Sequence, residues 1–208
     1  MKLFFVLTSV LFVFMFAFAQ TNKISQKEKD AIVYMREEEK LARDVYNLFY
    51  DQWNMNPFGN IRQSEQIHMD RMETLILDFQ LEDPVKINGD KPGVFTNRFL
   101  QEQYNLLVKS GSRSIVDALK AGANIEELDI ADLEERIAQT NNTTILTQFH
   151  YLKQASENHL RAFTRRLKGE GVNYEPVILS KERFQTIITS ENSRNCGNGQ
   201  GKGGCGKR

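Results

Sequence analysis

The chain has 208 residues, and its 27 Lys and Arg residues balance its 27 Asp and Glu residues to a formal charge of zero. On whole-chain charge, this balance excludes a broadly basic nucleic-acid-binding protein and a polyanionic tail protein. With 40% hydrophobic and 26% charged residues, the composition is that of one ordinary globular domain.

The amino terminus has the pattern of a secretory signal peptide. Met1-Lys2 is followed by the apolar run LFFVLTSVLFVFMFAFA, which ends in small residues at Ala17-Phe18-Ala19. An uncleaved anchor is the alternative, because a run of about 17 residues borders on spanning length. No later segment approaches that length. We therefore expect residues 1–19 to be a signal peptide and the mature chain to be exported, periplasmic or secreted, with no stable membrane span.

Residues 26–189 show helical apolar periodicity with almost no strand alternation. The first long helix is predicted from an N-cap at Ser25 to Trp53, and the second over about 58–80. A shorter helix follows at about 96–110. The third long helix covers about 114–139, and the fourth starts after the polar stretch 140–143 and ends at Lys168-Gly169. The four prolines, at positions 57, 84, 92 and 176, all lie where these helices should break. An extended piece and a short closing helix are expected at 174–190.

The connections between these helices predict the fold. The links between the first and second and between the third and fourth long helices are short, whereas about 33 residues separate the second from the third. A long crossover in mid-chain is the connectivity of ferritin-like bundles. We therefore predict an all-α, ferritin-like four-helix bundle whose crossover contains a short extra helix.

Polar residues interrupt the apolar stripe of every long helix when about 100° is taken per residue. They are Glu38 and Glu39 on the first, Glu65 and His68 on the second, Glu126 and Asp129 on the third, and Ser156 and His159 on the fourth. Glu127 is expected to face away. Burying an unpaired carboxylate costs several kcal/mol, and no Lys or Arg lies centrally in these stripes. Carboxylates with imidazoles suit iron or manganese, so the pattern predicts a metal site.

Each of these residues also has a simpler interpretation. Glu37–Glu39 by itself is typical of a solvated charge run, and Glu126-Glu127 could also lie on the surface. A single buried histidine is more often structural than a ligand, and Tyr46 is more simply a core residue. The agreement in phase across four helices is what favours metal.

Several stretches resemble known proteins. Glu39-Lys-Leu-Ala42-Arg-Asp-Val-Tyr46 and Ser64-Glu65-Gln-Ile-His68 are similar to the first- and second-helix patterns of ferritin-like di-iron proteins. MREEEKLARDVY, NIRQSEQIHMDRM, SIVDALKAGANIEELDIADL and SENHLRAF together resemble the uncharacterised ferritin-like family known as domain of unknown function 2202, over about residues 28–185. Even the Gly-rich tail is similar.

The resemblance implies a set of metal ligands: Glu39, Glu65 with His68, Glu126 and His159. The di-iron pattern also has a Glu three residues before the last histidine, where this chain has Ser156. Asp129 or Glu38 would have to supply the missing carboxylate. Otherwise the site holds one metal, or an asymmetric pair.

The leading functional hypothesis is an exported protein with a non-haem redox site that holds one or two ions of iron or manganese. Its activity would be iron oxidation, metal sequestration, or reduction of O₂ or peroxide. The alternatives are a binding module with one structural ion and a metal-free interaction domain in which Glu65–His68 and Glu126–His159 are satisfied polar pairs. No nucleic-acid partner is expected, and ferritin-like bundles commonly form homodimers. Residues 190–208, which include Cys196 and Cys205, have the composition of a disordered tail.

Overall fold

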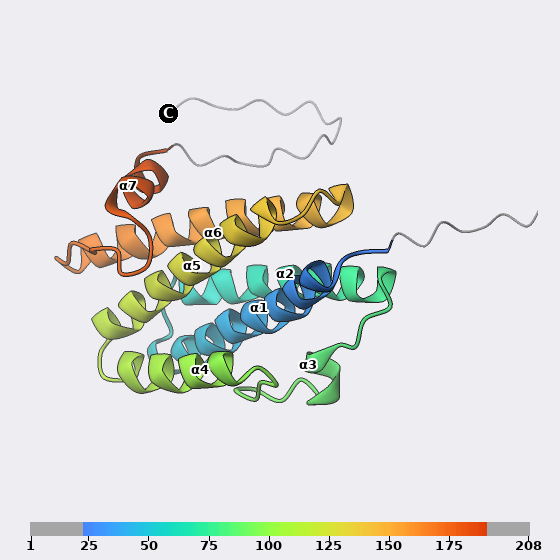
Figure 1. Cartoon of the computed structure of the whole chain (residues 1–208). Coiled ribbons are helices and arrows are strands. Elements are labelled where there is room, and N and C mark those ends of the chain that lie inside the picture. The colour runs from blue at the N-terminus through green and yellow to red at the C-terminus, as the bar shows by residue number, and fades with distance from the viewer. Residues whose placement is uncertain (1–22, 191–208) are drawn as a thin grey trace, which may run out of the picture.

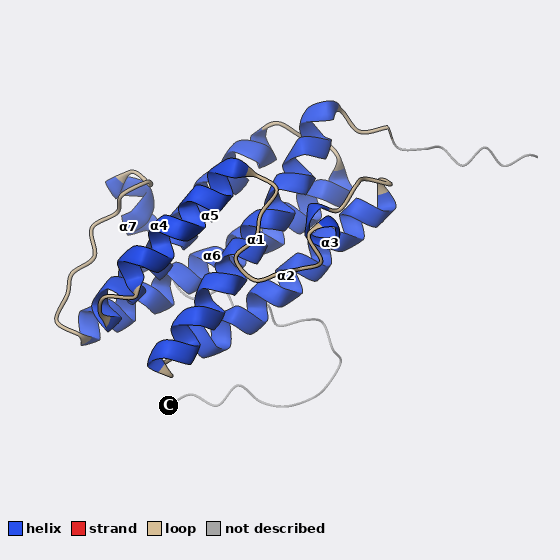
Figure 2. Ribbon diagram, turned by 90° about the horizontal axis from the view of Figure 1, so that it is seen from below, coloured by secondary structure: helices blue, strands red, loops and turns tan. Residues whose placement is uncertain are grey.

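The computed structural model describes residues 23–190. Within that range the protein is entirely helical, which confirms the all-α class (Figure 2). The helices are α1 (Gln26–Trp53), α2 (Phe58–Asp78), α3 (Pro84–Ile87), α4 (Arg98–Gly111), α5 (Ile115–Ala138), α6 (Thr143–Gly169) and α7 (Lys181–Thr189). The predicted signal peptide and the tail beyond residue 190, with both cysteines, lie outside the described residues.

Local side-chain chemistry explains where the long helices begin and end. Ser25 and Glu28 form a capping box at the start of α1, and Asn54 closes this helix in the left-handed conformation. Ser114 caps α5, and Asn142 caps α6 by accepting hydrogen bonds from two backbone N–H groups. The predicted ends of these three helices agree with the structure to within one or two residues.

The long helices pack as two hairpins. Helix α1 packs along α2, and α5 packs along α6; α1 also contacts α5, and α2 contacts α6 (Figure 1). The crossover between α2 and α5 contains α4, as predicted, and also the single turn α3, which the sequence reading took for a turn-rich segment. Asp83 caps α3, and Pro84 is its first residue. None of the described helices is both long and apolar enough to cross a membrane.

The hydrophobic core is divided into two clusters with a polar layer between them. On α1 the cluster residues Ile32 and Met35 precede Glu38 and Glu39, and the second cluster begins at Leu41. The same order, apolar then polar then apolar, recurs on α2 around Glu65 and His68 and on α6 around Ser156 and His159. The polar residues that the sequence placed inside the apolar stripes are therefore enclosed on both sides by packed hydrophobic side chains.

Candidate metal centre

Each long helix contributes to a buried cluster of carboxylates and imidazoles. Five residues form it: Glu39 from α1, Glu65 and His68 from α2, Glu126 from α5 and His159 from α6. His68 is fully buried, the three glutamates are 2% exposed, and His159 is 9% exposed. These are the five residues that the sequence reading singled out, and the packing of the helices brings all of them together.

The cluster consists of two groups that share one carboxylate. Glu39, Glu65 and His68 each offer a donor atom within 4.8 Å of the others, and Glu65, Glu126 and His159 do the same. Glu65 lies between the histidines: its Oε2 is 2.6 Å from His68 Nδ1, and its Oε1 is 2.9 Å from His159 Nδ1. Each group thus presents two carboxylates and one imidazole, and Glu65 is placed to bridge them.

Several of these donor atoms have no hydrogen-bond partner in the described part of the chain. They are Glu39 Oε1, Glu65 Oε1 and His159 Nδ1. The contact between His159 Nδ1 and Glu65 Oε1 has the distance of an ion pair but not the angles of a hydrogen bond. Buried polar atoms in native proteins are nearly always paired. Unpaired donor atoms that face a common centre are typical of metal ligands.

The mutual fields of these groups shift their pKa values. Burial raises the pKa of Glu39 to about 7, against the opposing effect of His68. Burial would also raise the pKa of Glu65, but the two histidines outweigh it and hold that pKa far below its usual range. For His159, burial is outweighed by the carboxylates of Glu65 and Glu126, which raise its pKa to about 10. The cluster therefore attracts positive charge, as protons or as metal ions.

The stretch Glu37–Glu39 is not a solvated charge run, because all three side chains are buried. Glu37 points away from the cluster and accepts the backbone N–H groups of Thr96 and Asn97 at 2.5 and 3.0 Å. Glu37 on α1 therefore fixes the start of α4, a structural role that the apolar periodicity of α1 cannot predict. Glu126 and Glu127 are also buried, so the surface interpretation of that pair is wrong as well.

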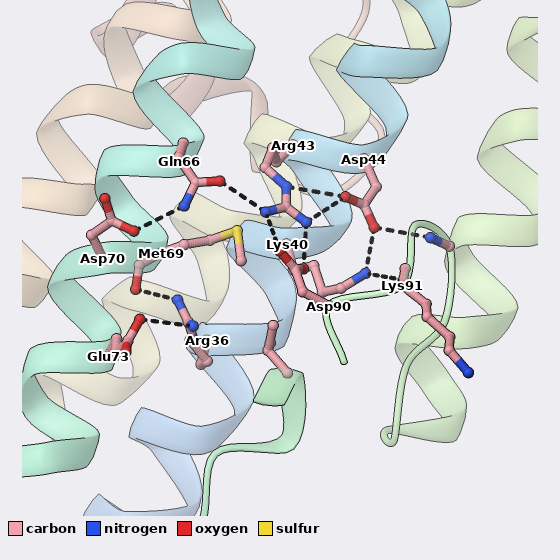
Figure 3. A network of polar contacts seen from close by, with 12 residues as sticks. Arg36, Lys40, Arg43, Asp44, Gln66, Met69, Asp70, Glu73, Asp90 and Lys91 are labelled. Carbon is pink, nitrogen blue, oxygen red and sulfur yellow. Dashed lines mark hydrogen bonds and ion pairs between the residues drawn. The ribbon is translucent and has the colours of Figure 1, made fainter. Parts of the chain in front are cut away.

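Basic residues are buried on α1 as well, but they pair with carboxylates outside the cluster. Arg36, Lys40 and Arg43 form a separate network between α1, α2 and the 88–93 loop (Figure 3). Arg36 pairs with Asp83 and Glu73, Lys40 with Asp44, and Arg43 with Asp44 and Asp90. These cations pair with carboxylates outside the cluster, so no described Lys or Arg compensates the charge of the cluster.

Glu38 and Asp129 lie next to the cluster but belong to neither group. Burial and the neighbouring charge of Asp129 raise the pKa of Glu38 well above its usual range, and neither Glu38 oxygen has a hydrogen-bond partner among the described residues. One oxygen of Asp129 accepts a hydrogen bond from Ser156, and the other has no hydrogen-bond partner in the part of the chain that the structure describes.

The structure adds two residues to the surroundings of the site. The hydroxyl of Tyr46, which is buried in the core as expected, also donates a 2.5 Å hydrogen bond to Glu126 Oε1. Ser64 Oγ lies 3.2 Å from His68 Nε2, the ring nitrogen that faces away from the carboxylates. Tyr46 lies on the same face of α1 as Ala42 and Glu39, a spacing that could have indicated its contact. Ser64 gave no comparable signal.

Comparison with known proteins shows which proteins the chain is similar to. The profile of the family described as "Uncharacterized protein domain (DUF2202)" matches residues 28–191. The uncharacterized protein MJ0754 of Methanocaldococcus jannaschii is 48% identical over 171 residues, which are 82% of this chain and 91% of the relative. The crystal structure of hypothetical protein MJ0754 superposes with a TM-score of 0.79, covering 82% of this chain and 96% of that one.

Proposed function

The chain belongs to the family described as an uncharacterized protein domain (DUF2202), and we propose a function that this description leaves open. The protein is a ferritin-like metal protein whose buried cluster binds two ions of iron or manganese and serves as a non-haem redox site. The observation that carries the proposal is the cluster itself: five buried donors from four helices, arranged as two groups that share Glu65.

The residues present fit such a metal pair. Glu39 Oε1, Glu65 Oε1 and His159 Nδ1 are buried without hydrogen-bond partners among residues 23–190, and the buried cations on α1 are paired with other carboxylates. Leaving charged oxygens buried and unpaired costs several kcal/mol, which a bound cation would offset. Carboxylate and imidazole donors suit iron and manganese, whereas no cysteine occurs in residues 23–190 to favour a thiolate-binding metal.

The ligand groups suggest how the ions would be held. Glu39, Glu65 and His68 would hold one ion, and Glu65, Glu126 and His159 the other. The connectivity of the long helices, with the crossover between α2 and α5, supports the ferritin-like assignment. Iron or manganese in such a site supplies the change of oxidation state that reduction of O₂ or peroxide requires.

The remaining residues prepare the site for that chemistry. The two hydrophobic clusters on either side of the polar layer keep bulk water away from the donors. Tyr46 fixes one oxygen of Glu126 by its hydrogen bond and so leaves the other free to bind. His159 is the most exposed of the five residues, at 9%. Iron oxidation, metal storage and peroxide removal all agree with this arrangement.

We place this activity outside the cytoplasm on the strength of the amino-terminal sequence. Residues 1–19 combine a basic start, an apolar run and a small-residue end. Amino-terminal sequencing of the mature protein should begin at Gln20. A protein that still begins at Met1 in the native host would contradict export by cleavage.

Metal stoichiometry tests the proposal most directly. The purified protein is stripped with a chelator and titrated with Fe²⁺ under anaerobic conditions, with mass spectrometry of the metal content and the melting temperature as readouts. We expect two irons per chain, a higher melting temperature and a new absorption band on addition of peroxide. His150→Ala is the matched control, because this histidine lies exposed on α6 and should change none of these results.

Two outcomes would contradict the redox function. One tightly held ion that does not react with peroxide would favour a single structural metal, the interpretation that Ser156 in place of a glutamate supports. No bound metal and an unchanged melting temperature would leave a metal-free helical domain.

A further inference from the structure

A serine lies where the sequence pattern of di-metal bundles has a carboxylate. In such bundles two of the helices each carry a Glu-x-x-His pair. Here α2 carries Glu65 and His68, but α6 carries Ser156 and His159. Ser156 is 1% exposed, so it faces the interior like the residue it replaces. Its hydroxyl is too short to take the place of a glutamate in the cluster.

Ser156 instead holds a carboxylate from the neighbouring helix. Its Oγ donates a hydrogen bond to Asp129 Oδ2 and contacts the carbonyl oxygen of Leu152, one turn earlier on α6, at 3.0 Å. Asp129 follows Glu126 by one turn of α5, so both side chains lie on the same face of that helix. The hydrogen bond therefore ties α6 to α5 at the level of the candidate metal centre.

The other carboxylate oxygen of Asp129, Oδ1, has no hydrogen bond within the described residues. Asp129 is 5% exposed, and no Lys or Arg within residues 23–190 forms an ion pair with it. Besides burial, the negative charges of Glu39, Glu126 and Glu65 raise the pKa of Asp129, and these are the three carboxylates of the cluster. Asp129 thus lies beside the cluster with one oxygen fixed and the other unused.

We propose that Asp129 is the fourth carboxylate of the dinuclear centre and that Ser156 is the residue that positions it. Asp129 supplies from α5 the oxygen that a second Glu-x-x-His would have supplied from α6, so α5 provides two carboxylates and α6 provides only an imidazole. Ser156 occupies Oδ2 and leaves Oδ1 as the metal-binding atom. The inference rests on the proposed function, because it assigns ligands within the same site.

The test compares four proteins by anaerobic Fe²⁺ titration and, with Mn²⁺, by electron paramagnetic resonance, which distinguishes coupled pairs of ions from single ions. They are the wild type, Asp129→Asn, Ser156→Ala and the double variant Asp129→Ala with Ser156→Glu. Asp129→Asn should lose one of two ions and the coupled signal. Ser156→Ala should weaken one ion by about tenfold or more, as is usual when a partner of a metal ligand is removed. The double variant, which restores Glu-x-x-His on α6, should regain two ions.

Asp132→Asn is the matched control. Asp132 lies one turn beyond Asp129 on α5 and forms an ion pair with Arg136, so its variant should keep both ions. Circular dichroism establishes that each variant is folded, and the asparagine keeps the shape of the side chain it replaces. If Asp129→Asn binds two ions as tightly as the wild type, the inference is wrong and the proposed function stands. If the wild type itself binds fewer than two ions, the dinuclear centre is wrong and this inference fails with it.

Discussion

The imidazole rings of His68 and His159 lie stacked in the interior, with their centroids 5.7 Å apart and their planes 22° from parallel. The rings come from α2 and α6, which are not neighbours in sequence, and Glu65 contacts the Nδ1 atom of each. Because both imidazoles contact one carboxylate, the pKa values of all three groups are shifted, and the stability of the protein should depend on pH.

The first consequence is the pH dependence of stability in protein stripped with a chelator. The pKa of His159 is raised from its ordinary 6.5 to about 10, so its contribution is fully present below about pH 6.5 and is lost as the pH rises towards 10. Glu39, with a pKa raised from 4.5 to about 7, acts in the same direction between those values. The free energy of unfolding should fall from pH 5 to pH 9 in urea titrations. A flat or rising profile would contradict these shifts, and His150→Ala should follow the wild type.

Substitutions of Glu65 and of Glu126 should differ in the number of metal ions that the protein loses. Because Glu65 belongs to both groups, Glu65→Gln should abolish binding of both ions. Glu126→Gln affects only one group and should leave one ion bound at Glu39, Glu65 and His68. Equal stoichiometry in the two variants would show that Glu65 is not shared. Metal content after anaerobic iron loading, with helicity as a check on folding, is the measurement.

Tyr46 should contribute to stability through its hydroxyl group. Tyr46→Phe removes a buried hydrogen bond to the carboxylate of Glu126, and bonds of this kind contribute about 1.5–3 kcal/mol. We expect a loss of about that size in the free energy of unfolding, with both ions retained. Tyr50→Phe is the control, because that ring is partly exposed and stacks against Arg62; its effect should stay within about 0.5 kcal/mol. A neutral Tyr46→Phe would show that the hydroxyl does not matter for stability.

Glu127 should anchor the segment that connects α6 to α7. Its carboxylate accepts hydrogen bonds from the Tyr174 hydroxyl and from the backbone N–H groups of Val177, Ile178 and Leu179. Glu127→Ala leaves these donors without their acceptor and should release the segment, so limited proteolysis should cleave within residues 172–180. Glu135→Ala, at an exposed position on the same helix, should leave the segment protected. Equal protection in both variants would contradict the anchoring role.

The sequence predicted the helices well because the signals for them are local. Capping residues such as Ser25 and Asn142 and the breaks at proline act within a few residues of the chain. The phase of a polar residue relative to the apolar stripe also depends only on helix geometry, and it indicated the inward-facing residues of each long helix, whereas the set of five ligands came from the family resemblance. The single turn α3 was missed because a four-residue helix has no periodicity to detect.

The surface interpretations of Glu37–Glu39 and of Glu126-Glu127 are wrong for a different reason. Glu37 is buried because its carboxylate accepts the backbone N–H groups at the start of α4, and Glu127 is buried because its carboxylate accepts those of residues 177–179. Both partner segments lie about 50 to 60 positions away along the chain. Phase on one helix shows which way a side chain points, but not whether another segment of the chain will cover it.

The sequence by itself therefore determined the helical class, the ends of the long helices and the identity of the inward-facing carboxylates and histidines, since each follows from spacing along one helix. Only the tertiary structure decided that Glu65 lies between two histidines, that Tyr46 reaches Glu126, and that Ser156 holds Asp129. Apart from the Glu65–His68 pair within α2, these contacts join residues 27 to 94 positions apart, and their distances depend on how α1, α2, α5 and α6 pack against one another.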